Sequence, residues 1–157
     1  MEGSSDRDYT SAVYGSLLVT TLIAVQWHHD VSTTFLGLSL VISVAVFWLT
    51  HVWAAIVNRR VHGPIDRAVI AALARDEAPM LTAAVVPTLF LALASAGVLE
   101  VDIGIGIALL VSLVQLFLWG LAVGWAAHAS WPLALGVAAV DGALGVAIVV
   151  LKVLVLH

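Results

Sequence analysis

Cysteine is absent from the 157-residue chain, and charged residues make up only 10% of it. The lack of cysteine excludes disulfides, thiolate metal sites and cysteine nucleophiles. The six Lys and Arg residues form no long basic run, and the formal net charge is −4, which argues against a nucleic-acid partner. The motifs GxSxG, GxGxxG and the P-loop are also missing, so we expect neither an enzyme nor a bound cofactor.

Apolar residues fill most of the chain: 62% of it is hydrophobic, with a mean hydropathy of +1.12. A soluble domain of this length needs a polar surface and could not bury so much apolar area. Only helices and closed barrels cross a bilayer, and long runs without two-residue alternation favour helices. The sequence therefore predicts an all-α integral membrane protein, a single transmembrane domain over residues 1–157, with the lipid bilayer as its main partner.

Five apolar runs predict a bundle of about five transmembrane helices. Their expected bounds are 9–26, 34–57, 79–99, 103–125 and 131–156. The first run is near the lower limit of about 17 residues for a span, so a half-inserted first helix would leave four spans. Residues 65–75 predict a short amphipathic helix at the membrane surface, because Ile65, Val69 and Leu73 share one face.

The basic residues predict the orientation of the chain. Four of the six lie between the second and third runs: Arg59, Arg60, Arg67 and Arg75. The positive-inside rule then places the connection 58–78 in the cytoplasm and indicates a plasma (cytoplasmic) membrane. We expect the first run to be a retained span, because no clear signal-peptide cleavage site follows it.

Asp141 is the acidic residue that lies deepest within an expected span. It is about ten residues, or roughly 15 Å, into the run 131–156, which is close to the bilayer midplane. A charge at that depth costs from about 3 to more than 10 kcal/mol, so the side chain must face protein or water. Asp141 is therefore a candidate ion or proton site. The alternative is a structural carboxyl group that joins helices through hydrogen bonds.

His51 lies in an aromatic stretch of the second run. Phe47, Trp48 and Trp53 are expected to pack around it. Two interpretations stay open for this histidine. It could be a proton-sensitive group beside a pathway, or a neutral core residue that is hydrogen-bonded to a neighbouring helix.

Gln115 is expected near the depth of Asp141, where other runs also carry a polar or kinked position. These positions are Ser43, Pro87 and either Thr20 or Thr21. Such a layer could bind a solute or merely join helices through hydrogen bonds. Small residues at close-packing spacing predict helix contacts, some of them between subunits of a homo-oligomer. They are Ala12, Ser16 and Thr20 in the first run and Gly120 and Gly124 in the fourth.

His28, His29 and Asp30 combine imidazole and carboxylate groups in the first turn, a combination that suits a transition metal. Adjacent histidines in a turn seldom both bind one ion, and no HExxH motif is present. We therefore expect no metal site, and keep these three residues as weak candidates for one.

The segment Phe47-Trp48-Leu49-Thr50-His51, which follows Ser43 and precedes basic residues, resembles the aromatic-Trp-x-x-His helix of the endolysosomal potassium-channel family and its prokaryotic relatives. The first run is similar to the pore-lining first helix of that family, although Val13-Tyr14-Gly15 stand where the family has Phe-Ser-Asp. The resemblance covers at most residues 9–58. It implies an oligomeric cation channel with the first helices around the pore and the Trp and His behind them.

We therefore expect a small oligomeric membrane protein that conducts an ion or passes a small solute, with a monovalent cation or a proton as the possible cargo. Asp141, Gln115 and His51 are the expected pathway residues. A non-catalytic accessory or interaction protein is the first alternative, and a membrane metal-handling protein with an outward His and acid cluster is the second.

Overall fold

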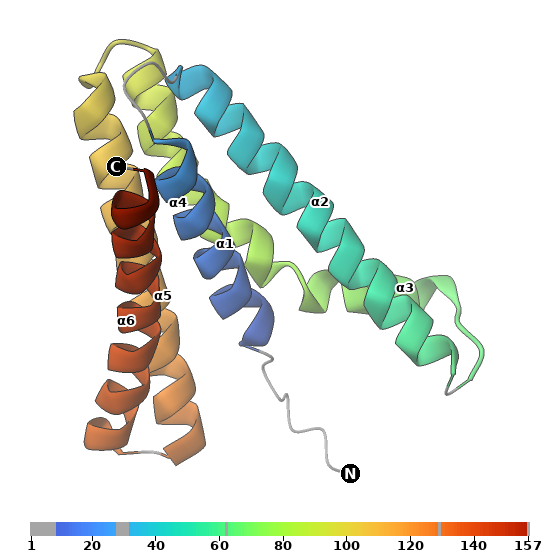
Figure 1. The fold of residues 1–157 in the computed structure, drawn as a ribbon. Coiled ribbons are helices and arrows are strands. Elements are labelled where there is room, and N and C mark those ends of the chain that lie inside the picture. Colours follow the sequence, from blue (N-terminus) through green and yellow to red (C-terminus); the bar gives the residue numbers. More distant parts are fainter. Residues whose placement is uncertain (1–8, 28–31, 62, 129, 157) are drawn as a thin grey trace.

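A computed structural model describes residues 9–27, 32–61, 63–128 and 130–156, and these residues form six α-helices without a β-strand (Figure 1). The helices are α1 (Thr10–Gln26), α2 (Thr33–Arg60), α3 (Arg67–Asp76), α4 (Pro79–Ser95), α5 (Val101–His128) and α6 (Trp131–Leu156). The prediction of an all-α fold is confirmed for this part of the chain.

The centre of the molecule is α1, which contacts α2, α4, α5 and α6. Its small residues Ala12, Ser16 and Thr20 are all fully buried, because they let the surrounding helices approach closely. The most extensive contact in the chain joins α5 to α6, and the two lie side by side in Figure 1. Helices α1, α4, α5 and α6 thus form a bundle with α1 in its interior.

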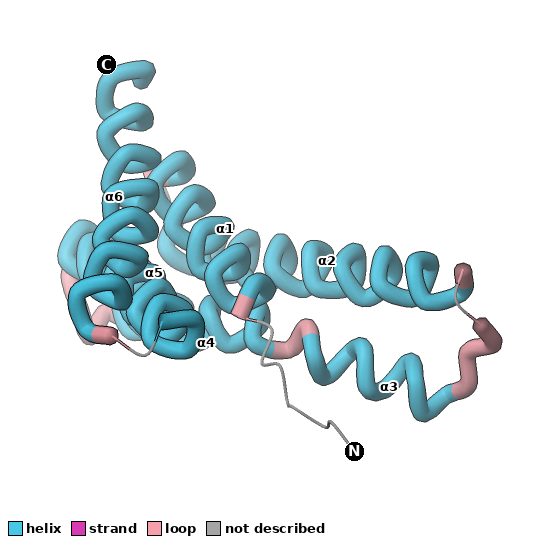
Figure 2. The backbone as a smooth tube through the Cα atoms, turned by 90° about the horizontal axis from the view of Figure 1, so that it is seen from below, coloured by secondary structure: helices cyan, strands magenta, loops and turns pink. Residues whose placement is uncertain are grey.

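Helix α2 reaches α1 as far along as His51, whose ring meets that of Tyr14, and it packs most closely on the bundle over its first half. There it packs against α4, where Thr34 Oγ1 lies 2.6 Å from Ser95 Oγ. Its second half leans away from the bundle and carries α3 beside it, so the two helices project to one side (Figure 2). Trp48 joins the pair, because its Nε1 donates a hydrogen bond of 3.2 Å to the carbonyl oxygen of Ala74.

Local sequence signals explain where the helices begin and end. The Asp66 carboxylate accepts a 2.8 Å hydrogen bond from the Val69 amide and so caps the start of α3. Pro79 opens α4, a position where its missing N–H has no intrahelical partner to lose. Gly97 has a φ of 74°, which ends α4 before Leu99, the end that we expected for the third span.

The described helices support fewer spans than the five that we expected. Three are long and apolar enough to cross a membrane, namely α2, α5 and α6. Helices α3 and α4 together would make a fourth span, although they meet at a bend of 46°. Helix α1 has only 17 residues, which is about 25 Å, and this is shorter than a hydrocarbon core of about 30 Å. The structure thus shows three to four candidate spans.

Helix α3 has the amphipathic character that its sequence predicts. Val69 and Leu73 are half-buried on one face, whereas Arg67 and Arg75 are exposed. The helix runs crosswise to α5 and α6 (Figure 1), as a helix at a membrane surface would if α5 and α6 cross the bilayer.

Candidate functional site

Asp141 lies on the side of α6 that packs against α5. The buried residues of α6 next to it, Ala138 and Gly145, are three residues before and four residues after it, so all three share one helical face. A Cβ atom at position 120 of α5 would lie only 2.5 Å from Asp141 Oδ2. The Asp141 carboxylate therefore occupies space that exists because residue 120 is a glycine.

Gly124 continues the same close approach one turn further along α5. A Cβ atom there would lie 2.6 Å from the Cα of Ala134 and 3.0 Å from its carbonyl oxygen. Gly120 and Gly124 thus bring α5 and α6 together within one chain. The helix contact that their spacing predicts is intramolecular here, so these two glycines leave no free stripe for a second subunit.

The Asp141 side chain is only half-buried, and no hydrogen bond or nearby charge from the described residues acts on its carboxylate. A carboxylate in this position loses part of its hydration without receiving a compensating partner. Such a group needs water, a bound cation or a proton.

A second set of polar groups lies between α1 and α5. The hydroxyl oxygens of Thr20 and Ser112 are both buried and lie 3.1 Å apart, at hydrogen-bond distance. The rings of Tyr9 and Trp119 also meet, with centroids 6.2 Å apart. These two contacts show that α1 and α5 run antiparallel.

One turn from the Thr20–Ser112 pair, each helix carries a buried oxygen without a partner. Ser16 lies four residues before Thr20, and Gln115 lies three residues after Ser112, so both are displaced in the same direction. Ser16 Oγ and Gln115 Oε1 are buried and have no hydrogen-bond partner among the described residues. Thr88 Oγ1 of α4 is a third such atom.

Asp141 packs on Gly120, which lies five residues, or about 7.5 Å, beyond Gln115 in α5. Lys152 Nζ donates a 2.7 Å hydrogen bond to the carbonyl oxygen of Trp27, which fixes the end of α6 against the end of α1. By these contacts Asp141 lies within about two helical turns of Ser16 and Gln115, nearer to the level of Gly120 than to that of Gln115. We call the set Ser16, Thr20, Ser112, Gln115 and Asp141 the polar seam.

The polar seam offers oxygen atoms from one carboxylate, one amide and three hydroxyl groups. Oxygen donors suit small hard cations, water and protons rather than soft transition metals. Among the described residues, no group of three or more His, Cys, Asp or Glu side chains could hold a metal ion. His28, His29 and Asp30, the weak metal candidates, lie outside the described residues.

His51 lies apart from the polar seam, between α1 and α2. Its Nδ1 is 3.0 Å from the Phe47 carbonyl oxygen, and its ring centroid is 5.0 Å from that of Tyr14. Phe47 also meets Tyr14, at 6.2 Å, so this cluster is an aromatic contact between two helices. The structure thus places His51 in packing and not with Asp141 and Gln115. Tyr14, which sequence reasoning did not single out, could have been found as the aromatic residue in a helix rich in small ones.

The tryptophans near His51 have separate roles. Trp48 is hydrogen-bonded to α3, whereas Trp53 is exposed on the outside of α2. We expected Trp53 to pack around His51, but two helical positions correspond to a rotation of about 200°, which turns Trp53 away from it.

The Lys152 contact gives a first testable prediction. Lys152→Met should lower the free energy of unfolding by about 1 kcal/mol, because the Trp27 carbonyl at the end of α1 loses a charged donor. Denaturant titration of the purified protein in micelles would measure the change. Lys152→Arg, which keeps a cationic donor, is the control, and equal stability of the Met and Arg variants would contradict the capping role.

Comparisons with known proteins identify no relative for this site. No family model, curated protein or solved structure matches the chain.

Proposed function

We propose that this protein carries a proton or a small monovalent cation across a membrane along the polar seam. The observation that supports the proposal is the presence of two buried oxygens without a described partner, on α1 and α5, and of a half-exposed carboxylate without one on α6. They are Ser16 Oγ, Gln115 Oε1 and the Asp141 carboxylate.

The energetics of these groups argue for an occupant. A buried polar atom without a partner costs about 1–3 kcal/mol, and native proteins contain few of them. A seam that served only to join helices would pair its groups, as Thr20 and Ser112 do. Buried oxygens without partners, with a carboxylate within about two helical turns of them, are instead suited to hold a ligand that enters and leaves.

The single carboxylate indicates the charge of that ligand. One negative charge among neutral oxygens balances one proton or one monovalent cation, whereas tight binding of a divalent ion usually takes more carboxylates. Asp141 would attract the cation, and the Ser16 hydroxyl and the Gln115 amide oxygen would replace part of its hydration shell.

The proposal includes the placement of the chain in its membrane. Helices α1 and α4 would cross beside α2, α5 and α6 to make five spans of a plasma (cytoplasmic) membrane, and loop 58–78 would face the cytoplasm. The potassium-channel resemblance implies a pore between the first helices of several subunits. Because α1 packs against four helices of its own chain, we propose a route inside each subunit of a homo-oligomer.

Flux through liposomes that contain the purified protein tests this function. Asp141→Asn should reduce proton or monovalent cation flux at least about tenfold, because it removes the only charge in the seam. Separate measurements with a pH-sensitive dye and with K⁺- and Na⁺-sensitive dyes would identify the ion. Asp102→Asn is the matched control, since Asp102 is an exposed carboxylate at the start of α5 and should leave flux unchanged.

The other outcomes have defined meanings. Equal flux by wild type and Asp141→Asn would refute the role of Asp141. Absence of wild-type flux for protons, K⁺ and Na⁺ would reject the permeation function and favour a non-conducting accessory protein.

A further inference from the structure

The outer side of α2 carries an apolar stripe that no other part of the described chain covers. Its members recur at intervals of three or four residues and therefore share one helical face. They are Ile42, Val46, Leu49, Trp53 and Val57, all exposed. A stripe of this kind faces either lipid chains or another protein.

The chemistry at the C-terminal end of this stripe distinguishes lipid from protein. Arg60 continues the same helical face, and its guanidinium carbon lies 5.8 Å from the centroid of the Trp53 ring. The Trp53 side chain is 59% exposed, so protein does not enclose its ring. Along α2, the order is therefore aliphatic residues, then an indole, then a guanidinium. A phospholipid presents the same order of hydrocarbon, interface and phosphate.

The dimensions of the stripe match one lipid leaflet. From Ile42 to Trp53 the helix rises about 16 Å, which is close to half of a hydrocarbon core of about 30 Å. The backbone of Arg60 lies about 10 Å beyond that of Trp53, and its guanidinium turns back to the Trp53 ring, where the interface meets the headgroups. An acyl chain can thus lie along Ile42, Val46 and Leu49 while its phosphate reaches Arg60.

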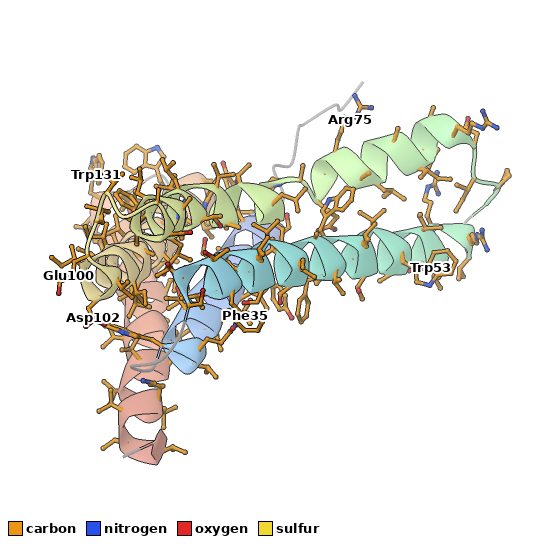
Figure 3. All side chains as sticks on the ribbon, turned by 90° about the horizontal axis from the view of Figure 1, so that it is seen from above. Phe35, Trp53, Arg75, Glu100, Asp102 and Trp131 are labelled. Carbon is orange, nitrogen blue, oxygen red and sulfur yellow. The ribbon has the colours of Figure 1, made fainter. Side chains whose placement is uncertain are left out.

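The charge around Arg60 favours an anionic lipid. Arg59 and Arg67 are also exposed near the turn between α2 and α3. The nearby Asp66 carboxylate is already engaged as the cap of α3. The acidic residues Glu100 and Asp102 lie at the opposite end of the molecule (Figure 3). The end of the α2–α3 pair is therefore a local excess of positive charge beside an apolar stripe.

We infer that the outer face of α2 binds an anionic phospholipid, with the phosphate held by Arg60 and supported by Arg59. Arginine binds phosphate oxygens through two parallel N–H donors. The Trp53 ring keeps the Arg60 guanidinium in place from one side. The site lies on a different helix from the polar seam and does not depend on the proposed function.

Lipid binding to the purified full-length protein tests the inference. The protein in detergent would be titrated with phosphatidylglycerol or with phosphatidylcholine of the same acyl chains, and bound lipid would be counted by native mass spectrometry. Wild type should prefer phosphatidylglycerol. Arg60→Gln should weaken that binding about fivefold, the usual effect of one basic residue near anionic headgroups.

Arg75→Gln is the matched control, because it makes the same charge change on the other side of the α2–α3 pair (Figure 3). Its effect should be well below that of Arg60→Gln. An equal loss in both variants would reduce the site to general attraction and overturn the inference. Equal binding of both lipids, or displacement of phosphatidylglycerol by inorganic phosphate, would overturn it as well. A dimer that covers α2 and excludes lipid would replace it with a protein interface.

Discussion

Gly124→Ala should destabilise the protein by about 1–3 kcal/mol, whereas Gly106→Ala in the same helix should stabilise it by about 0.5–1 kcal/mol. The new methyl group at position 124 would lie 2.6 Å from the backbone of Ala134, so α5 and α6 would have to separate. At position 106 nothing lies within 4 Å, and the substitution only removes the conformational freedom of glycine from a helix interior.

Denaturant titration in micelles, followed by circular dichroism, would measure both variants under identical conditions. The prediction depends on the opposite signs of the two changes. If Gly124→Ala were as stable as Gly106→Ala, the close contact between α5 and α6 would be wrong. The position of Asp141 between α5 and α6 depends on the same close contact at Gly120, so it would be contradicted as well.

Gln115→Leu should make the protein more stable and less active at the same time. The substitution removes a buried amide oxygen that has no partner, so the free energy of unfolding should rise by about 1–2 kcal/mol. It also removes a proposed ligand of the transported ion, so liposome flux should fall at least about fivefold. Unfolding and flux would be measured on the same preparation.

This combination separates a pathway from simple packing. If Gln115 joined helices through a hydrogen bond, its loss would lower stability, because its partner would remain buried and unpaired. Lower stability would therefore contradict the unsatisfied state of Gln115. Greater stability with unchanged flux would remove Gln115 from the pathway. Thr21→Val serves as the control, since the Thr21 hydroxyl already donates to the Leu17 carbonyl oxygen in its own helix.

The sequence predicts the helices well because their signals are local. Pro79 opens α4 as its position predicts, and the amphipathic pattern of residues 65–75 corresponds to α3. Helix α4 ends at Ser95, four residues before the end of the run 79–99 that the sequence predicts. A single glycine, Gly97, ends it, whereas the apolar residues that follow continue the hydropathy signal.

The candidate site was predicted only in part, because it depends on contacts between distant helices. The positions of Asp141 and Gln115 inside long apolar helices could be inferred from the sequence, because both lie within apolar runs. The pairing of Thr20 with Ser112 could not be inferred, since it joins residues that are 92 positions apart. The separation of His51 from these groups likewise depends on the direction in which α2 leans.

The contact between Lys152 and Trp27 has a consequence for the order in which the protein matures. Helix α1 leaves the ribosome before α6, yet the cation that satisfies the end of α1 belongs to α6. During synthesis the Trp27 carbonyl must rely on water or lipid headgroups until α6 has been inserted. The contact between α1 and α6 therefore forms only once α6 is complete, whereas the contacts of α1 with α2, α4 and α5 can form before it.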